Sequence, residues 1–284
     1  MSGVLCVLAG ASSAFNFNAT ISATTTNYSL NSAMTAAGWN GIDRVIATVS
    51  INSGVYVGSS SIATPAFTVG TLPVASTVSI TNNGYIVGRG GDAPGGAGGP
   101  ALTVSSPITI TNNNVIGGGG GGGGSGAGFS YNDGENSGSA RGGGGGGGAG
   151  YLNGAGSATV GSNVNFSQLS AGSSGSTGGN TSGGGGGAGF YGWVPYISPN
   201  TYSSGGSGGS GGNLGSSGNT GANAYYAGEI WGGGAITAGT GPQAGVTYNS
   251  PAATSGGAAG YCTTTGSNAN ITWAVAGTRY GTLG

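Results

Sequence analysis

The sequence predicts an all-β and irregular fold, in which an N-terminal region of rung-like β-repeats is followed by a bundle of polyglycine-II helices, with very little α-helix. Three observations lead to this fold class. A segment repeats about every 30 residues between positions 45 and 116. Long Gly runs that end on aromatic residues lie within positions 117–260, and one stretch alone has helical periodicity.

The chain opens on an apolar stretch, MSGVLCVLAGASSAF. It faintly resembles a signal peptide, but no positively charged residue precedes the apolar run. We therefore favour an N-terminal strand that docks on a neighbour, and we assign residues 1–44 to an attachment segment. No stretch reaches the length of a transmembrane helix. Cys6 and Cys262 lie near opposite ends of the chain, which favours free thiols over a disulfide, although the disulfide stays open.

The helix signal lies in residues 28–43, YSLNSAMTAAGWNGID. Ser29 can cap the first turn, since a Ser side chain there accepts a backbone N–H. Leu30, Met34 and Ala37 fall on one face, and Gly38 can adopt the left-handed conformation that ends a helix. The sequence therefore predicts a short helix inside the attachment segment.

Residues 45–116 repeat one pattern of alternating β-branched residues, an Asn-rich turn, a short apolar pair and then Gly. The copies are VSINSGVYVG (49–58), VSITNNGYIVG (78–88) and ITITNNNVIGG (108–118). Ile51, Ile80 and Ile110 lie 29 and 30 residues apart. Strands repeated at this period predict stacked β-rungs that bury their apolar faces on one another. A plain meander of β-hairpins is the alternative.

Residues 117–260 contain Gly runs at 117–124, 142–148 and 183–187, each followed closely by Gly-Ala-Gly and an aromatic residue. Polyglycine can form an extended threefold helix without internal hydrogen bonds. Its N–H and C=O groups must then pair with neighbouring chains wherever they are buried. We predict a bundle of such helices, with the aromatics capping its ends. A looser Gly/Ser run lies at 205–212, and for residues 203–220 a flexible linker stays equally open. Residues 261–284 are expected to form a C-terminal strand.

Disorder is the general alternative, because 72 Gly and 9 Pro in 284 residues reach the level at which low-complexity chains become common. Against disorder stand 13 Tyr, 6 Phe and 4 Trp, with only 3% charged residues. The low charge also bears on partners. A nucleic-acid ligand needs several cations to neutralise phosphates, and four scattered Arg residues do not supply them. We expect no nucleic-acid partner and no membrane insertion.

The residue types for catalysis are scarce, and we expect no enzyme activity, no cofactor and no metal site. The chain has no His, the commonest general base and metal ligand. Asp133 and Glu135 are close in sequence, but acids between Gly runs are more typical of a solvated loop than of an acid/base pair or an oxygen-ligand cation site. The segment GRGGDAPGGAGG (88–99) lacks the Lys and the helix of a phosphate-binding loop.

Two aromatic clusters offer a better basis for function, as contact surfaces. The segment FYGWVPYISPNTY (190–202) and the neighbourhood of Glu229 combine Tyr and Trp with Ser, Asn and Gly. This composition gives large contact area at low entropic cost and also suits sugar rings. The candidate contact residues are Tyr191, Trp193, Tyr196, Tyr202, Tyr225, Tyr226 and Trp231. The alternative is that these aromatics seal the ends of the glycine bundle.

Several segments resemble the glycine-rich receptor-binding modules at the tips of tailed-phage tails and fibres. They are AAGWNG (36–41), VSINSGVYVGSSSIATPAFTVGTLP (49–73), the NNG-x-I-x-G-x-GG turn at 82–91, and ITWAVAGTRYGTLG (271–284). The architecture also resembles the polyglycine sandwich of the small adhesins that cap long fibres. The loops of those adhesins do not match this chain residue by residue, so no site is transferred from them.

The resemblance implies a bacteriophage tail-tip or tail-fibre adhesin that binds a host cell-surface receptor, a glycan or an outer-membrane protein. Its other partners would be phage tail proteins, with a homo-oligomer possible, and its location the virion, after assembly in the host cytoplasm. A purely structural fibre component is the nearest alternative. An ice-binding protein is a weaker one, because the spacing between the Gly runs lacks regular rows of Thr or Ala.

Overall fold

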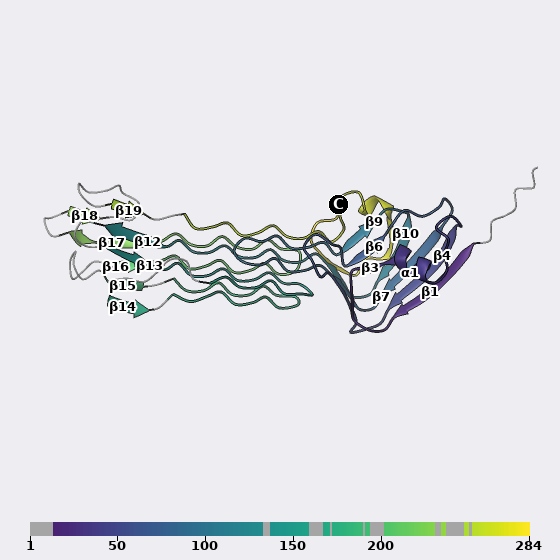
Figure 1. The fold of residues 1–284 in the computed structure, drawn as a ribbon, viewed down its shortest axis with the longest axis horizontal. Helices are drawn as coiled ribbons and strands as arrows, with labels where there is room; N and C mark the ends of the chain where they lie inside the picture. Colours follow the sequence, from purple (N-terminus) through teal and green to yellow (C-terminus); the bar gives the residue numbers. More distant parts are fainter. Residues whose placement is uncertain are drawn as a thin grey trace, which may run out of the picture.

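A computed structural model shows an elongated molecule with three parts in series (Figure 1). A body of parallel β-sheets lies at one end, long glycine-rich runs extend from it, and short strands form the opposite tip. The structure describes residues 14–132, 137–158, 167–170, 172–189, 191–193, 202–230, 234–236, 247–249 and 252–284.

The β-body is a solenoid of three parallel sheets, which the chain visits in turn. The first sheet has the order β1 (Phe15–Ile21), β4 (Val45–Ile51), β7 (Thr77–Asn82), β10 (Ile108–Asn112) and β20 (Ile271–Val275). The second has the order β2 (Thr25–Thr26), β5 (Tyr56–Gly58), β8 (Tyr85–Val87), β11 (Val115–Gly117) and β21 (Thr278–Tyr280). The third has β3 (Tyr28–Ser29), β6 (Phe67–Val69) and β9 (Leu102–Val104). Every strand pairing in these sheets is parallel. The prediction of stacked rungs is therefore confirmed, and the alternative of a hairpin meander is wrong.

The strand register differs by two residues from the alignment of the first two repeats and agrees with the alignment of the second and third. Val49 pairs with Ile80, and Ile80 pairs with Ile110, whereas Ile51 pairs with Asn82. Because side chains alternate faces along a strand, a shift of two leaves the same positions facing inward. The β4 strand accordingly alternates buried and more exposed residues along its length. The pattern of the repeats thus predicted the inward face and the stacking of Ile80 on Ile110 correctly, and the stacking partner of Ile51 wrongly.

At one corner of the core, the buried positions are occupied by asparagines instead of aliphatic residues. Asn82 and Asn112 are fully buried. The Asn82 side-chain amide donates to Asn112 Oδ1 at 2.8 Å, and Asn112 Nδ2 donates to the Ala276 carbonyl at 2.9 Å. A buried amide costs little when its hydrogen bonds are made. This ladder therefore holds three successive coils in register at the turn.

The predicted helix is confirmed as α1 (Leu30–Ala36). The Ser29 side chain accepts the Ser32 N–H, and Gly38 follows the last turn with φ +101°. Leu30 and Met34 are fully buried against the solenoid core. The N-terminal strands and α1 thus share one hydrophobic core with residues 45–116.

The glycine-rich region is inserted into a coil of the solenoid. The chain leaves after β11 at Gly117 and returns at Thr263, which bridges Leu102 of β9. After a 3-10 turn, η1 (Asn268–Asn270), it forms β20 and β21, so residues 261–284 add a further coil rather than the single strand expected. Both ends of the insertion are therefore fixed on the same rigid body.

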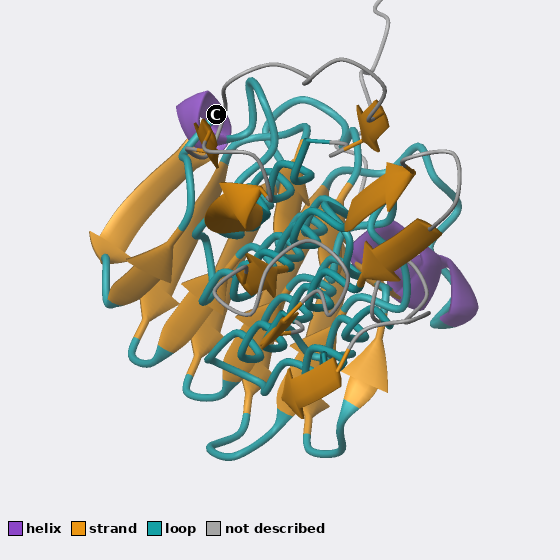
Figure 2. Cartoon of the chain, turned by 90° about the vertical axis from the view of Figure 1, so that its left-hand side faces the viewer, coloured by secondary structure: helices purple, strands orange, loops and turns teal. Residues whose placement is uncertain are grey.

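The glycine runs are extended and pair side by side, and Figure 2 shows them end-on in the middle of the molecule. They occupy residues 118–128, 141–150, 154–158, 172–179, 183–189, 205–213, 216–224 and 252–260. Residues 88–99, which the sequence grouped with the β-repeats, add two further short runs joined at a cis Ala93–Pro94 bond.

Hydrogen bonds between runs recur at every third residue. The N–H groups of Gly143, Gly146 and Ala149 donate to Gly206, Gly209 and Gly212 at 2.8, 2.9 and 3.0 Å. Between these positions, the Gly144 N–H donates to the Ser173 carbonyl at 3.0 Å and the Gly145 N–H donates to the Ser157 hydroxyl at 2.7 Å. Successive residues of one run therefore bond to different neighbours.

At most glycines of the runs, the spacing between runs leaves no room for a side chain. A Cβ added at Gly145 would lie 2.1 Å from the Gly123 carbonyl oxygen. In the Gly/Ser run 205–212, a Cβ at Gly209 would lie 2.0 Å from the Asn219 oxygen. That run is packed like the others, so the flexible-linker alternative is excluded for it.

Aromatic residues join the glycine runs to the solenoid. Tyr151, which follows the run 142–148, packs with Tyr56 and with the buried Val87 and Leu214. Tyr56 also stacks on Tyr85, with ring centroids 4.4 Å apart. The predicted capping role thus fits Tyr151. Phe129 and Phe190, which end the other two runs, have side chains outside the described part of the chain.

We expect Gly145→Val to lower the free energy of unfolding by ~1–3 kcal/mol or more, because its side chain would displace backbone that is already hydrogen-bonded. At Gly185, a Cβ would meet nothing nearer than the Ser176 hydroxyl at 3.7 Å. Gly185→Val is therefore the matched control. Thermal melts of both variants and the wild type provide the measurement. Equal melting temperatures for the two variants would contradict the close packing.

Burial of Cys262 makes the stability of the folded protein depend on pH in the alkaline range. It is fully buried, its thiol donates to the Ile116 carbonyl, and burial raises its pKa to about 12 against the effects of Arg279 and a Tyr280 backbone hydrogen bond. The folded state keeps the thiol protonated while an unfolded chain loses the proton near pH 9, so stability falls as pH rises from about 9 to 12. Unfolding free energies at pH 8 and 10 should differ less in Cys262→Ala than in wild type. Identical pH dependence in both would contradict the shift.

Candidate functional site

The tip consists of two small antiparallel sheets at the far end of the glycine runs (Figure 1, left; Figure 2, front). One has the order β13 (Ser137–Ala140), β12 (Phe129–Asn132) and β19 (Thr247–Asn249). The other has the order β14 (Ser167–Ser170), β15 (Tyr191–Trp193), β16 (Tyr202–Ser204), β17 (Tyr225–Ile230) and β18 (Gly234–Ile236).

The larger sheet brings the two predicted aromatic clusters together. Tyr191 and Trp193 lie on β15, Tyr202 on β16, and Tyr225 and Tyr226 on β17. Trp193 pairs directly with Tyr202 across the strands. Tyr196 and Trp231 lie outside the described residues. Segments separated by more than twenty residues in sequence are therefore adjacent strands of one tip.

The pairing register sorts these positions by face. Tyr191 is opposite Ser204, which is opposite Tyr225, and Tyr202 is opposite Ala227. Opposed residues share a face of an antiparallel sheet, and residues two apart along a strand share it too. Backbone positions 191, 193, 202 and 225 thus belong to one face, and position 226 belongs to the other.

The glycine runs below set this strand order. The runs 183–189 and 205–213 are antiparallel neighbours, with Gly208 and Gly211 donating to Gly187 and Gly184. They continue directly into β15 and β16, which pair antiparallel in the same way. The runs 205–213 and 216–224 lead likewise to β16 and β17. The tip sheet extends a pairing that the glycine body has already made.

Sequence reasoning missed β14, which joins the edge of the aromatic sheet by pairing with β15. Its residues, SQLS, carry no aromatic and no charge, so composition offered no signal. Its place follows instead from the next run, 172–179, where Ser173 and Ser176 donate to Ala188 and Gly185 of the run that leads to β15.

Charged groups are sparse around the tip and the runs. Arg141 is the first residue of the run 141–150, and its Nε is buried without a hydrogen-bond partner among the described residues. Arg89 pairs with Asp92 at 3.0 Å near the solenoid. Glu229 lies on β17, whereas Asp133 and Glu135 are outside the described residues. Within the described ranges, no group of three or more His, Cys, Asp or Glu side chains could hold a metal ion.

Within the same ranges, no helix has the length and apolar character needed to cross a membrane. The described part of the chain thus combines a solenoid with its own core, a long glycine-rich body with few charged residues and a distal layer of short strands. This arrangement defines an elongated glycine-rich β-protein with two distinct ends.

The chain belongs to the phage tail fibre adhesin Gp38 family, whose model matches residues 16–284. Its fold is also similar to a crystal structure of the gp37–gp38 adhesin tip complex of the bacteriophage S16 long tail fibre. That similarity has 20% sequence identity and a TM-score of 0.46, and covers 94% of this chain and 81% of the other. No curated protein sequence matches the chain. Family membership confirms the resemblance seen in the sequence and makes the chain a component of a virion tail fibre.

Proposed function

We propose that the chain attaches a phage to its host by binding a cell-surface receptor, a glycan or an outer-membrane protein, through the tip strands and their connecting segments. The carrying observation is that one tip sheet gathers Tyr191, Trp193, Tyr202, Tyr225 and Tyr226 at the end furthest from the solenoid. Binding is by reversible contact, with no chemical step, and several fibres on one virion multiply its strength.

Aromatic positions on a rigid sheet favour this function. Tyr and Trp supply large contact areas and lose little conformational entropy on binding. Contact residues of this type also dominate measured binding energies. The neighbouring Ser203, Ser204 and Gly192 positions give the sheet the adaptable polar composition that recognition surfaces share.

The glycine runs act as the stiff spacer, and we assign them to the polyglycine-II conformation. The three-residue repeat of their lateral hydrogen bonds supports this assignment, because that helix has three residues per turn. At ~3.1 Å per residue, the run 141–150 spans about 30 Å. The bundle would hold the tip at this distance from the solenoid.

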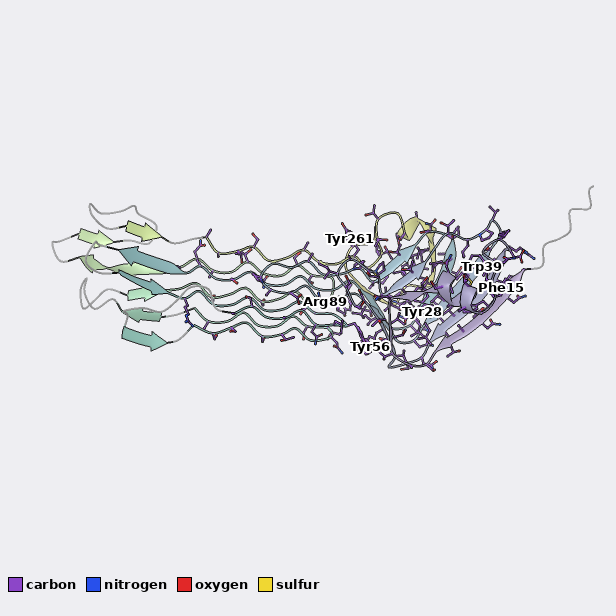
Figure 3. All side chains as sticks on the ribbon, in the orientation of Figure 1. Phe15, Tyr28, Trp39, Tyr56, Arg89 and Tyr261 are labelled. Carbon is purple, nitrogen blue, oxygen red and sulfur yellow. The ribbon has the colours of Figure 1, made fainter. Side chains whose placement is uncertain are left out.

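The opposite end of the solenoid is the proposed attachment surface for other fibre proteins. Its first coil, within residues 1–44, leaves β1 as an edge strand, and Phe15 and Trp39 lie in this part of the molecule (Figure 3). Ile42 is 79% exposed and Val74 95% exposed in the turns of the first coils. Exposed apolar side chains beside an open sheet edge favour a protein partner there.

The receptor proposal is tested with purified protein that competes with phage for adsorption to host cells. Trp193→Ala and Tyr202→Ala should each weaken competition by about 30-fold, the effect of losing a contact worth ~2 kcal/mol. Tyr261→Ala is the control, since Tyr261 is 46% exposed on the solenoid side of the body. If the wild-type protein does not compete at all, the chain is a structural fibre component instead.

Attachment is tested by point substitution, because deletion of residues 1–44 would remove the buried Leu30 and Met34 from the core. We expect Ile42→Asp combined with Val74→Asp to reduce incorporation into virions at least ~10-fold, since a charge would enter an apolar interface. Ile62→Asp is the control, at a 44% exposed position elsewhere on the solenoid. Incorporation is measured by quantitative immunoblot of purified virions. Normal incorporation of the double variant would place the attachment surface elsewhere.

A further inference from the structure

One side of the glycine run 205–213 has no neighbouring run among the described residues. The run 205–213 pairs with four neighbours, the runs 118–128, 141–150, 183–189 and 216–224. These pairings use most of its backbone groups. Among the described residues, no backbone hydrogen bond is made by the N–H groups of Ser207, Ser210 and Asn213 or by the carbonyls of Gly208 and Gly211.

The free groups recur every three residues, like the groups that are paired. Gly206, Gly209 and Gly212 donate to one neighbour, whereas the N–H groups one residue later in each triplet have no partner among the described residues. On the adjacent run 183–189, Gly186 also makes no hydrogen bond with any described residue. Each of the four neighbours is joined to the run 205–213 through either a row of N–H groups or a row of carbonyls. The free donors and the free acceptors, each with a repeat of about 9 Å, therefore face adjacent directions on the open side of the run.

A preformed trough lies over part of these groups, those of Ser210, Gly211 and Asn213. Residues 210–213 form its floor, 183–185 one wall and Ser216, Ser217 and Asn219 the other, and its volume is about 330 Å³. Side chains of the floor are bonded to both walls. Asn213 Oδ1 accepts the Gly183 N–H at 3.1 Å, and the Ser210 hydroxyl accepts from Asn219 Nδ2 at 2.7 Å.

We propose that this trough binds an extended glycine- and serine-rich segment of another polypeptide, which adds one more run to the body. The proposal rests on the polyglycine-II assignment but not on the receptor site. It is the glycine counterpart of adding a strand to an exposed sheet edge. A threefold chain is favoured because it alone repeats its own N–H and C=O groups at the spacing of the free rows.

The lining limits the occupant further. No lining residue carries a charge or a large apolar side chain, which disfavours acidic polymers and amphipathic helices. The neighbouring runs approach closely enough to exclude Cβ atoms, so a guest packed as they are needs Gly at the positions that face the floor. Ser at the outward positions matches the pattern GGSGGSGGN of residues 205–213.

The probe is an acetylated and amidated (Gly-Gly-Ser)5 peptide, titrated into protein labelled with ¹⁵N at Gly and Ser. We expect amide shifts at Gly186, Ser210 and Gly211, and at least ~10-fold weaker binding in Ser217→Leu, which would fill the trough from its wall. Ser174→Leu, at an exposed position on another run, should bind like wild type. The tip variant Trp193→Ala should also bind normally, which separates this site from receptor binding.

Three results would overturn the proposal. They are absence of shifts at millimolar peptide, shifts spread over the tip instead of the trough, and unchanged affinity in Ser217→Leu with an unchanged melting temperature. Dextran is titrated in parallel, as a neutral hydroxyl-rich polymer. If dextran shifts the trough amides and the peptide does not, the trough is a glycan site.

Discussion

Backbone hydrogen bonding between glycine runs is the constraint on which the rest of the structure depends. A buried extended chain has no internal partner for its N–H and C=O groups, so each run must lie against others at one fixed spacing. That spacing excludes a side chain at most glycines of the runs, as at Gly145 and Gly209, where a Cβ would come within 2.0–2.1 Å of a neighbouring carbonyl oxygen. Glycine is therefore selected by contact with carbonyl oxygens, rather than by flexibility.

The solenoid supplies the hydrophobic core that the glycine body lacks. Glycine loses more backbone entropy on ordering than any other residue, and its runs bury almost no apolar side chains in return. The solenoid has a continuous core that includes Leu30, Phe67 and Ile110. Inserting the body into one coil fixes both its first and its last run on that core. The tyrosines around Tyr151 then tie the ends of the inner runs to the same surface.

The sequence was informative wherever a feature is local. Alternating residues predicted the inward faces of β4, and Ser29 and Gly38 predicted the ends of α1. It was not informative about partners distant in the chain. The return of residues 271–284 to β10 and β11 has no local signal, because an edge strand and a terminal strand have the same composition. The partner of Ile51 was misjudged for a related reason, since stacking registers two residues apart bury the same side chains.

For the candidate site too, the sequence predicted local features but not contacts between segments distant in the chain. Composition identified the aromatic positions on β15, β16 and β17, but their adjacency comes from the pairing of the runs below them. Strand order at the tip is thus set by glycine contacts that involve no tip side chain. Tip residues can consequently change without altering the packing that positions them. If the tip is the receptor-binding surface that we propose, this arrangement separates the choice of contact residues from the stability of the scaffold, as loops on a rigid framework do.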